Sequence, residues 1–107
     1  MTGASEGIGL GLLQHYQRLG WQTVGSSRRT HGPAEADHWI PADLSDSAQQ
    51  TAAVEQLTQD LGWPDLVVLN AGVGHWATAS ETERSDAERV LELNYWTPVE
   101  LTRMLAE

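Results

Sequence analysis

The sequence predicts an α/β fold with a parallel sheet, and two observations carry this prediction. Segments in which apolar residues recur at helical spacing alternate with short runs of β-forming residues, a pattern typical of a sheet with crossover helices. Residues 66–69 form an aliphatic run without polar alternation, as in a strand buried on both faces of a parallel sheet. A chain of 107 residues accommodates one such domain and excludes a second. We therefore expect a single three-layer domain over residues 1–107.

The amino-terminal part is expected to contain one helix and two strands. Apolar residues that recur at helical spacing from Ile8 predict a helix over residues 7–19, with Gly20 as its end. The β-forming residues 21–26 predict a strand after this helix. A second strand is predicted over residues 38–40, where Pro41 ends it.

Two further helices are predicted from capping signals. Ser47, with Gln50 three residues later, indicates a capping box that opens a helix over residues 46–61. Ser80 or Ser85, each with a glutamate three residues later, begins a helix that runs toward the C-terminus. No strand precedes the first helix, so we expect the first strand of the sheet to be absent and a slot to lie between its neighbours.

The composition excludes several classes of partner and site. The formal net charge of −9 opposes binding to the phosphate backbone of nucleic acids and to anionic membranes. Cysteine is absent, which excludes disulfides and thiolate sites, and the four histidines show no metal-ligand spacing. No aliphatic run is long enough to cross a bilayer, and no leader pattern opens the chain. We expect no nucleic-acid, metal or membrane partner and a cytoplasmic location.

Residues 2–9 form a glycine-rich loop that opens the first predicted helix. The first amide groups of a helix, with the positive end of its dipole, can hold a pyrophosphate, and glycines let the backbone approach it. The spacing Gly3-x-x-x-Gly7-x-Gly9 differs from both the P-loop and the Gly-x-Gly-x-x-Gly pattern. The alternative is a glycine-rich turn without a ligand. The candidate cofactor-binding residues of this loop are Thr2, Gly3, Ser5, Glu6, Gly7, Ile8 and Gly9.

Together with Thr2 and Ile8, these glycines resemble the Thr-Gly-x-x-x-Gly-Ile-Gly fingerprint of the short-chain dehydrogenase/reductase family. Further motifs of that family follow in order, namely Asp43-Leu44, Asn70-Ala71-Gly72 and the helix residue Asn94. The resemblance covers the whole chain and implies a partial Rossmann fold, a doubly wound parallel sheet, without its first strand and C-terminal half. It further implies adenine contacts from Asp43 and Leu44, a cofactor site at Asn70, Ala71 and Gly72, and a proton relay supported by Asn94.

The polar residues of these motifs also have simpler interpretations. Asp43 is favourable near a helix N-terminus whatever it binds, and Asn70 is a common former of left-handed turns. Asn94 shares helical spacing with apolar residues, so its amide is expected to face inward and to need a partner. Pro98 lacks the N–H that would bond the Asn94 carbonyl, which either frees this oxygen for the relay or simply kinks the helix.

The chain departs from the family at the residues that the resemblance makes catalytic. The family's catalytic Ser and Tyr-x-x-x-Lys are expected beyond the last residue of this sequence. The two tyrosines, Tyr16 and Tyr95, are followed four residues later by Gly20 and Val99, and lysine is absent. We therefore expect this chain by itself to be inactive.

The loop after residue 26 indicates the cofactor. NAD sites usually place an acid at the end of the second strand, whereas NADP sites place an arginine there for the 2′-phosphate. Arg28 and Arg29 stand at this position without an acid, so NADP is favoured over NAD. Glu6 occupies a position that is often basic in NADP users, and it would repel the phosphate unless Arg29 pairs with it. The alternative is a solvated pair of loop charges.

The leading functional hypothesis is an NADP-dependent carbonyl reductase or alcohol dehydrogenase that acts on a small-molecule carbonyl or alcohol. The full-length protein is expected to be a homo-oligomer, because the family often uses the helix over residues 80–107 for dimer contacts. The alternative is a non-catalytic dinucleotide-binding remnant or regulatory protein. A methyltransferase is disfavoured because the acid expected after its second strand is absent.

Overall fold

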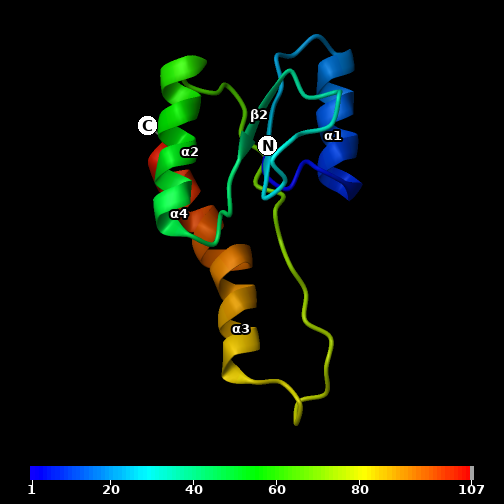
Figure 1. Cartoon of the computed structure of the whole chain (residues 1–107), viewed down its shortest axis with the longest axis vertical. Helices are drawn as coiled ribbons and strands as arrows, with labels where there is room; N and C mark the ends of the chain where they lie inside the picture. Colours follow the sequence, from blue (N-terminus) through cyan, green and yellow to red (C-terminus); the bar gives the residue numbers. More distant parts are fainter. Residues whose placement is uncertain (107) are drawn as a thin grey trace.

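A computed structural model describes residues 1–106 as an elongated arrangement of helices around a small parallel sheet (Figure 1). The chain extends over 48 × 26 × 23 Å, and its radius of gyration is 14.6 Å. A compact chain of this length has a radius of about 13 Å. The excess comes from residues 72–83 and helix α3 (Arg84–Leu91), which project from the rest of the molecule (Figure 1).

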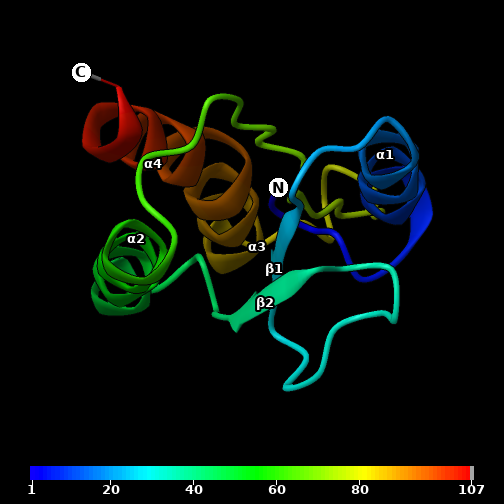
Figure 2. The ribbon, with the colours of Figure 1, turned by 90° about the horizontal axis from the view of Figure 1, so that it is seen from above.

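Helix α1 (Gly7–Arg18) lies on one side of the sheet, and helices α2 (Ser47–Asp60) and α4 (Thr97–Leu105) lie on the other (Figure 2). This three-layer arrangement confirms the predicted α/β class. Helix α1 matches its predicted range, and Leu13 on its inner face is fully buried. Ile8 is 77% exposed, so the apolar spacing placed this residue on the wrong face.

Strands β1 (Val24–Ser27) and β2 (His38–Pro41) form a parallel pair in which Val24 aligns with His38 and Ser27 with Pro41. Strand β1 begins later than predicted because the N–H of Thr23 donates to the Asp37 side chain instead of to a strand. Pro41 belongs to β2, where it is the last residue in register with β1.

Residues 66–69 were expected to form a strand buried on both faces of the sheet, and this prediction is wrong. The structure gives residues 66–69 no strand conformation. Met1 and Thr2 lie between this run and β1. The amino group of Met1 donates to the Val24 carbonyl of β1 (2.7 Å), and the N–H of Thr2 donates to the Val68 carbonyl of the run (3.0 Å). Thr2 also forms an isolated parallel bridge with Ser26. Two residues cannot supply the ladder that a run of four needs.

An apolar groove of about 260 Å³ continues from Met1 between β1 and the run 66–69. Its walls are side chains of β1, β2, α2 and the run itself, with Leu101 and Leu105 of α4 at one end. This groove occupies the slot that the order of elements predicts. The described part of the chain therefore has the architecture of a partial Rossmann fold whose sheet is open in the middle.

The cap of α2 differs from the prediction. Asp46 is the N-cap, and its carboxylate accepts the N–H groups of Ala48 and Gln49. Gln50 does not reach back to the cap. Its side chain is buried, and its amide donates to the Leu44 carbonyl at 2.7 Å. The capping box at Ser47 is therefore wrong because the carboxylate one residue earlier already satisfies these donors.

The carboxyl-terminal helix is also capped by acids instead of serines. Glu83 caps α3 in a reciprocal box with Asp86. The helix continues through a π-helical turn, η1 (Glu92–Trp96), into α4 without a break. This wider turn directly precedes Thr97 and Pro98, where a proline interrupts the regular hydrogen-bond ladder.

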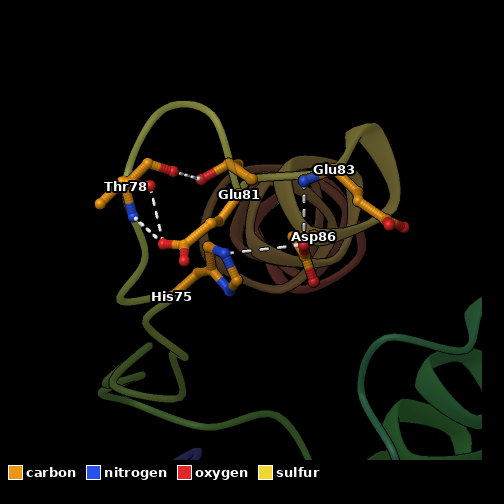
Figure 3. Close-up of polar contacts among 6 residues, drawn as sticks. His75, Thr78, Glu81, Glu83 and Asp86 are labelled. Carbon is orange, nitrogen blue, oxygen red and sulfur yellow. Dashed lines mark hydrogen bonds and ion pairs between the residues drawn. The ribbon is translucent and has the colours of Figure 1, made fainter.

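The segment that leads into α3 carries a group of polar contacts, shown in Figure 3. The Glu81 carboxylate accepts the N–H and hydroxyl of Thr78 at 3.2 and 2.7 Å, and these bonds lower the pKa of Glu81. His75 lies 3.6 Å from the Asp86 carboxylate, which also accepts the N–H of Glu83 at 3.1 Å. These contacts fold the projecting segment onto the start of α3.

The main apolar cluster lies between the sheet and helices α2 and α4. Ala42, Leu44 and Leu101 are buried at its centre. Partly buried apolar side chains surround them, namely Ala53, Val54, Leu69, Leu93 and Met104. In the described part of the chain, no helix combines the length and apolar character needed to span a membrane.

Candidate functional site

The glycine loop is folded tightly against residues 70–71. Gly3 has a φ of +63°, which a side chain would strain, and a Cβ there would lie 2.9 Å from the Cα of Ala71. Gly9 is buried in the first turn of α1, where a Cβ would clash with the Gly3 carbonyl and the Asn70 amide. The spacing of these glycines thus allows three backbone segments to meet at the start of α1.

Thr2 and Asn70 hold these segments together. The Thr2 hydroxyl oxygen accepts the N–H groups of Asn70 and Ala71, both at 3.0 Å. In return, the Asn70 side-chain amide donates to the carbonyls of Thr2 (3.3 Å) and Gly3 (3.2 Å). Asn70 does not have a positive φ, so its interpretation as a left-handed turn former is wrong.

A cavity of about 800 Å³ opens beside this loop, at the carboxyl ends of β1, β2 and the run 66–69. It brings together ten of the residues predicted to bind a cofactor: Gly3, Ser5, Glu6, Arg28, Arg29, Asp43, Leu44, Asn70, Ala71 and Gly72. Its volume lies within the range of small-molecule and cofactor sites. Open α/β sheets bind their ligands in this position.

Five predicted residues do not line the cavity, although four of them build the loop beside it: Thr2, Gly7, Ile8, Gly9 and Asn94. The lining also contains residues that the sequence analysis missed: Ser27, Ala42, Ser45, Val73, Arg89 and Leu93. Ser27, Ala42, Ser45 and Val73 directly adjoin predicted residues, so extending each motif by one or two positions would have found them. Arg89 and Leu93 are one helical turn apart, and no local signal indicates them.

Charged side chains cluster at the end of the cavity next to β1. Glu6 is the N-cap of α1 but makes no side-chain capping bond there, because its carboxylate pairs with the Arg29 guanidinium at 2.7 Å. The hydroxyl and N–H of Ser45 both donate to Asp43, at 2.7 and 3.0 Å, and lower the pKa of its carboxyl, with a smaller electrostatic contribution from Arg28. Asp46 is the N-cap of α2, and Asp43 lies three residues before it.

Asn94 lies on η1 and is exposed, whereas the sequence analysis expected it to face inward. The π-helical turn changes the helical register at this residue, which explains the difference. Its amide group does have a partner: it donates to the Val73 carbonyl and accepts the Val73 N–H, both at 2.8 Å. Asn94 therefore holds a residue of the cavity wall without lining the cavity itself.

Within residues 1–106, His, Cys, Asp and Glu side chains form no group of three or more that could hold a metal ion. The first amide groups of α1 remain without a side-chain cap. A helix N-terminus of this kind, beside the carboxyl ends of parallel strands, is typical of α/β proteins that bind dinucleotides. The fold and the cavity together define this class.

The chain belongs to the short-chain dehydrogenase family, whose family model matches residues 1–107. Human dehydrogenase/reductase SDR family member 7 is 32% identical over 96% of this chain and 34% of its own length. A fatty acyl-CoA reductase of Mycobacterium tuberculosis is 32% identical over 99% of this chain and 40% of its own length. The chain thus spans little more than a third of these curated relatives.

Two solved structures of the same fold carry nicotinamide cofactors. The 3-ketoacyl-(acyl-carrier-protein) reductase of Brucella melitensis, complexed with NADH, has a TM-score of 0.88 and 30% identity over 98% of this chain and 47% of its own. The NADPH-bound carbonyl reductase from chicken fatty liver has a TM-score of 0.86 and 25% identity over 97% of this chain and 48% of its own. A nicotinamide dinucleotide is the cofactor common to both.

Proposed function

We propose that residues 1–107 form the cofactor-binding part of an NADP-dependent carbonyl reductase or alcohol dehydrogenase. The observation that carries this proposal is the cavity at the carboxyl ends of the strands, where the uncapped start of α1 and Arg28 lie at the same ligand site. The relatives named above include reductases with NADH and with NADPH bound, so they support the reaction class and leave the choice of cofactor to the residues of this chain.

The residues present fit such a dinucleotide. The start of α1 offers amide donors and a positive dipole end for the pyrophosphate, and no side chain at Gly3 or Gly7 blocks its approach. Asp43 and Leu44 line the cavity below β2, where the adenine would lie. Asn70, Ala71 and Gly72 also line the cavity. When bound, the cofactor supplies the hydride at C4 of its nicotinamide.

Arg28 is proposed to bind the 2′-phosphate of NADP. It lines the cavity directly after β1, and no acid stands at the end of this strand. A guanidinium binds phosphate through two parallel hydrogen bonds, whereas the free ribose hydroxyl of NAD offers it no charge. Discrimination between the two cofactors is therefore assigned to this side chain.

The test is Arg28→Asp in the complete dehydrogenase that contains residues 1–107. Loss of the charged hydrogen bonds and the added repulsion are expected to raise the NADPH dissociation constant tenfold or more, by about 1.5 to 3 kcal/mol, with a much smaller change for NADH. Titration of cofactor fluorescence measures both constants. Arg18→Asp is the matched control, since Arg18 is exposed on α1 away from the cavity and gives the same change in net charge. Equal weakening toward both cofactors would reject the assignment.

Asn94 is proposed to support proton transfer, through its backbone carbonyl beside Pro98. Asn94→Ala in the complete enzyme is expected to lower kcat by more than it weakens NADPH binding, because a group that acts in the proton step stabilises the transition state specifically. Pro98→Ala should give a milder loss, since a restored N–H can engage the carbonyl. Circular dichroism checks the fold of both variants. An unchanged kcat in Asn94→Ala would show that Asn94 does not support proton transfer.

A non-catalytic dinucleotide-binding protein is the second candidate. Turnover of a small carbonyl with NADPH by the complete protein separates the two candidates, because the second predicts binding without turnover. The proposal also includes a single domain over residues 1–107, a homo-oligomeric full-length protein and a cytoplasmic location. Light scattering and cell fractionation test the last two points.

A further inference from the structure

Two neighbouring arginines at the end of the cavity differ in their surroundings. The Arg29 guanidinium pairs with the Glu6 carboxylate at 2.7 Å, so it links the loop after β1 to the first turn of α1. Among residues 1–106, Arg28 forms no ion pair closer than 4.0 Å. Glu6, Arg28 and Arg29 all line the same cavity. Arg28 is near enough to Asp43 to help lower the pKa of that carboxyl, but only Arg29 is held in a direct ion pair.

The backbone of Arg29 is held independently of its side chain. Its N–H donates to the Ser27 hydroxyl at 3.1 Å, and its carbonyl accepts the indole N–H of Trp39 at 2.8 Å. The Trp39 ring also packs against Gly32, where a Cβ would clash with the indole. Strand β2 thus fixes the position from which the Arg29 side chain reaches Glu6.

The position of Arg29 has a consequence for binding because of the charge on its partner, Glu6. Its carboxylate is a negative charge on the cavity wall, at the end where Arg28 would meet a 2′-phosphate. A phosphate monoester carries about −1.5 to −2 charges at neutral pH, so an unpaired carboxylate nearby would oppose it. Uncharged ribose, as in NAD, would not feel this repulsion to the same degree.

We propose that Arg29 is a positioning residue that neutralises Glu6, and that Glu6 and Arg29 together set the cofactor specificity of a site whose phosphate ligand is Arg28. This inference rests on the proposed function, because it concerns how the same cavity distinguishes NADP from NAD. It differs from a direct phosphate contact by Arg29 in one measurable respect. If Arg29 only neutralises Glu6, it becomes dispensable once Glu6 loses its charge.

The experiment is a double-mutant cycle in the complete dehydrogenase, with NADPH and NADH as the probes. Arg29→Gln is expected to raise the NADPH dissociation constant about tenfold and the NADH constant less than about twofold. In the Glu6→Gln background, the same substitution should change the NADPH constant by less than about threefold. Arg29→Lys retains the charge and should remain within about threefold of the parent.

Trp39→Phe gives an independent variant that leaves all the charges in place. It keeps an aromatic ring against Gly32 but removes the donor to the Arg29 carbonyl. It should weaken NADPH several-fold with Glu6 present and have little effect in Glu6→Gln. Thermal unfolding of each variant checks that the loss of binding is not a loss of fold.

The outcomes separate this inference from the proposed function. A parent protein that prefers NADPH, together with equal NADPH losses for Arg29→Gln in both backgrounds, would show that Arg29 binds the phosphate directly and would overturn the inference alone. A parent protein that does not prefer NADPH would overturn the NADP assignment and the inference with it. A loss of NADPH affinity that Arg29→Gln causes only when Glu6 is intact, in a parent protein that prefers NADPH, supports both the proposed function and the inference.

Discussion

Two short runs of the chain differ in whether they form a strand: Val24–Ser27 does, and residues 66–69 do not. The first contains a glycine and two serines, yet it forms strand β1 and pairs in full register with β2. The second is Leu-Val-Val-Leu, whose residues are more typical of strands, yet it forms none. Leu66 and Val67 are 45% and 37% exposed. A neighbouring strand, and not the composition of the run, decides the outcome.

Strand β1 is held by the hydrogen bonds of the sheet, whereas the run 66–69 is held by side chains near its end. Thr2 accepts the N–H groups of Asn70 and Ala71, and Asn94 pairs with both backbone groups of Val73. These contacts fix the end of the run but leave its beginning beside the open groove. The cavity beside the glycine loop therefore has one wall supported by a sheet and one supported by a few side chains.

The largest expected effect concerns the 107-residue chain made alone. We predict that it unfolds without a cooperative transition, because the apolar walls of the groove stay uncovered. We also predict that it does not oxidise NADPH with any carbonyl, because this sequence contains no Tyr-x-x-x-Lys. Calorimetry and absorbance at the nicotinamide band measure the two effects. The complete dehydrogenase is the control and should unfold cooperatively.

A sharp thermal transition in the 107-residue chain would contradict the first part of this prediction. It would show that the side-chain contacts of Thr2 and Asn94 suffice for the region after residue 65. Turnover by the chain alone would contradict the second part. Hydrogen exchange would locate the difference, since amides of β1 and β2 should be better protected than those of residues 66–69 in the chain alone.

An intermediate effect is expected for Thr2→Val in the complete protein. Valine keeps the shape of threonine but leaves the N–H groups of Asn70 and Ala71 without their acceptor, at a cost of about 1 to 3 kcal/mol. Urea unfolding measures this loss. Thr2→Ser retains the hydroxyl and should lie much closer to the parent; equal losses for both variants would mean that the hydroxyl does not hold this wall.

The smallest effect on stability is expected for a substitution of Asp37, next to the paired strands β1 and β2. Asp37 accepts the N–H and hydroxyl of Thr23, both at 2.8 Å, and these bonds lower the pKa of its carboxyl below the ordinary 3.8. A lowered pKa in the folded state gives stability that is present above about pH 4 and is lost as the pH falls through the folded value. Asp37→Asn should therefore be slightly less stable at pH 7, with the difference shrinking as the pH falls through the lowered pKa of Asp37. A constant difference across this range would exclude the carboxylate as its cause.

Much of the fold could be predicted because periodicity and glycine spacing are local signals. The range of α1 and the glycine loop before it follow from them. Asp43, Leu44 and residues 70–72 were instead named from the resemblance to the short-chain dehydrogenase/reductase motifs. Capping was predicted less well, since Asp46 and Glu83 took the positions assigned to nearby serines. Both acids lie within a few residues of the predicted caps, and a short sequence pattern does not show which of several neighbouring polar residues will cap the helix.

The remaining differences arise from contacts between distant residues. The strand expected over residues 66–69 depends on a neighbour elsewhere in the sheet, and the outward position of Asn94 depends on a π-helical turn. The pairing of Glu6 with Arg29 joins residues 23 positions apart. From the sequence this pair is only a condition for NADP binding, because the conformation of the two loops decides whether the charges meet.

The hydrogen bonds at Leu44 link the cavity to the opposite layer of the molecule. The Leu44 carbonyl accepts the Gln50 amide and the Thr97 hydroxyl, each at 2.7 Å, and Thr97 lies 53 residues further along the chain. The cavity wall at Leu44 is thus fixed by helices α2 and α4, which do not themselves line the cavity. We therefore expect a substitution at Thr97 to change the shape of this wall as well as the packing of the two helices.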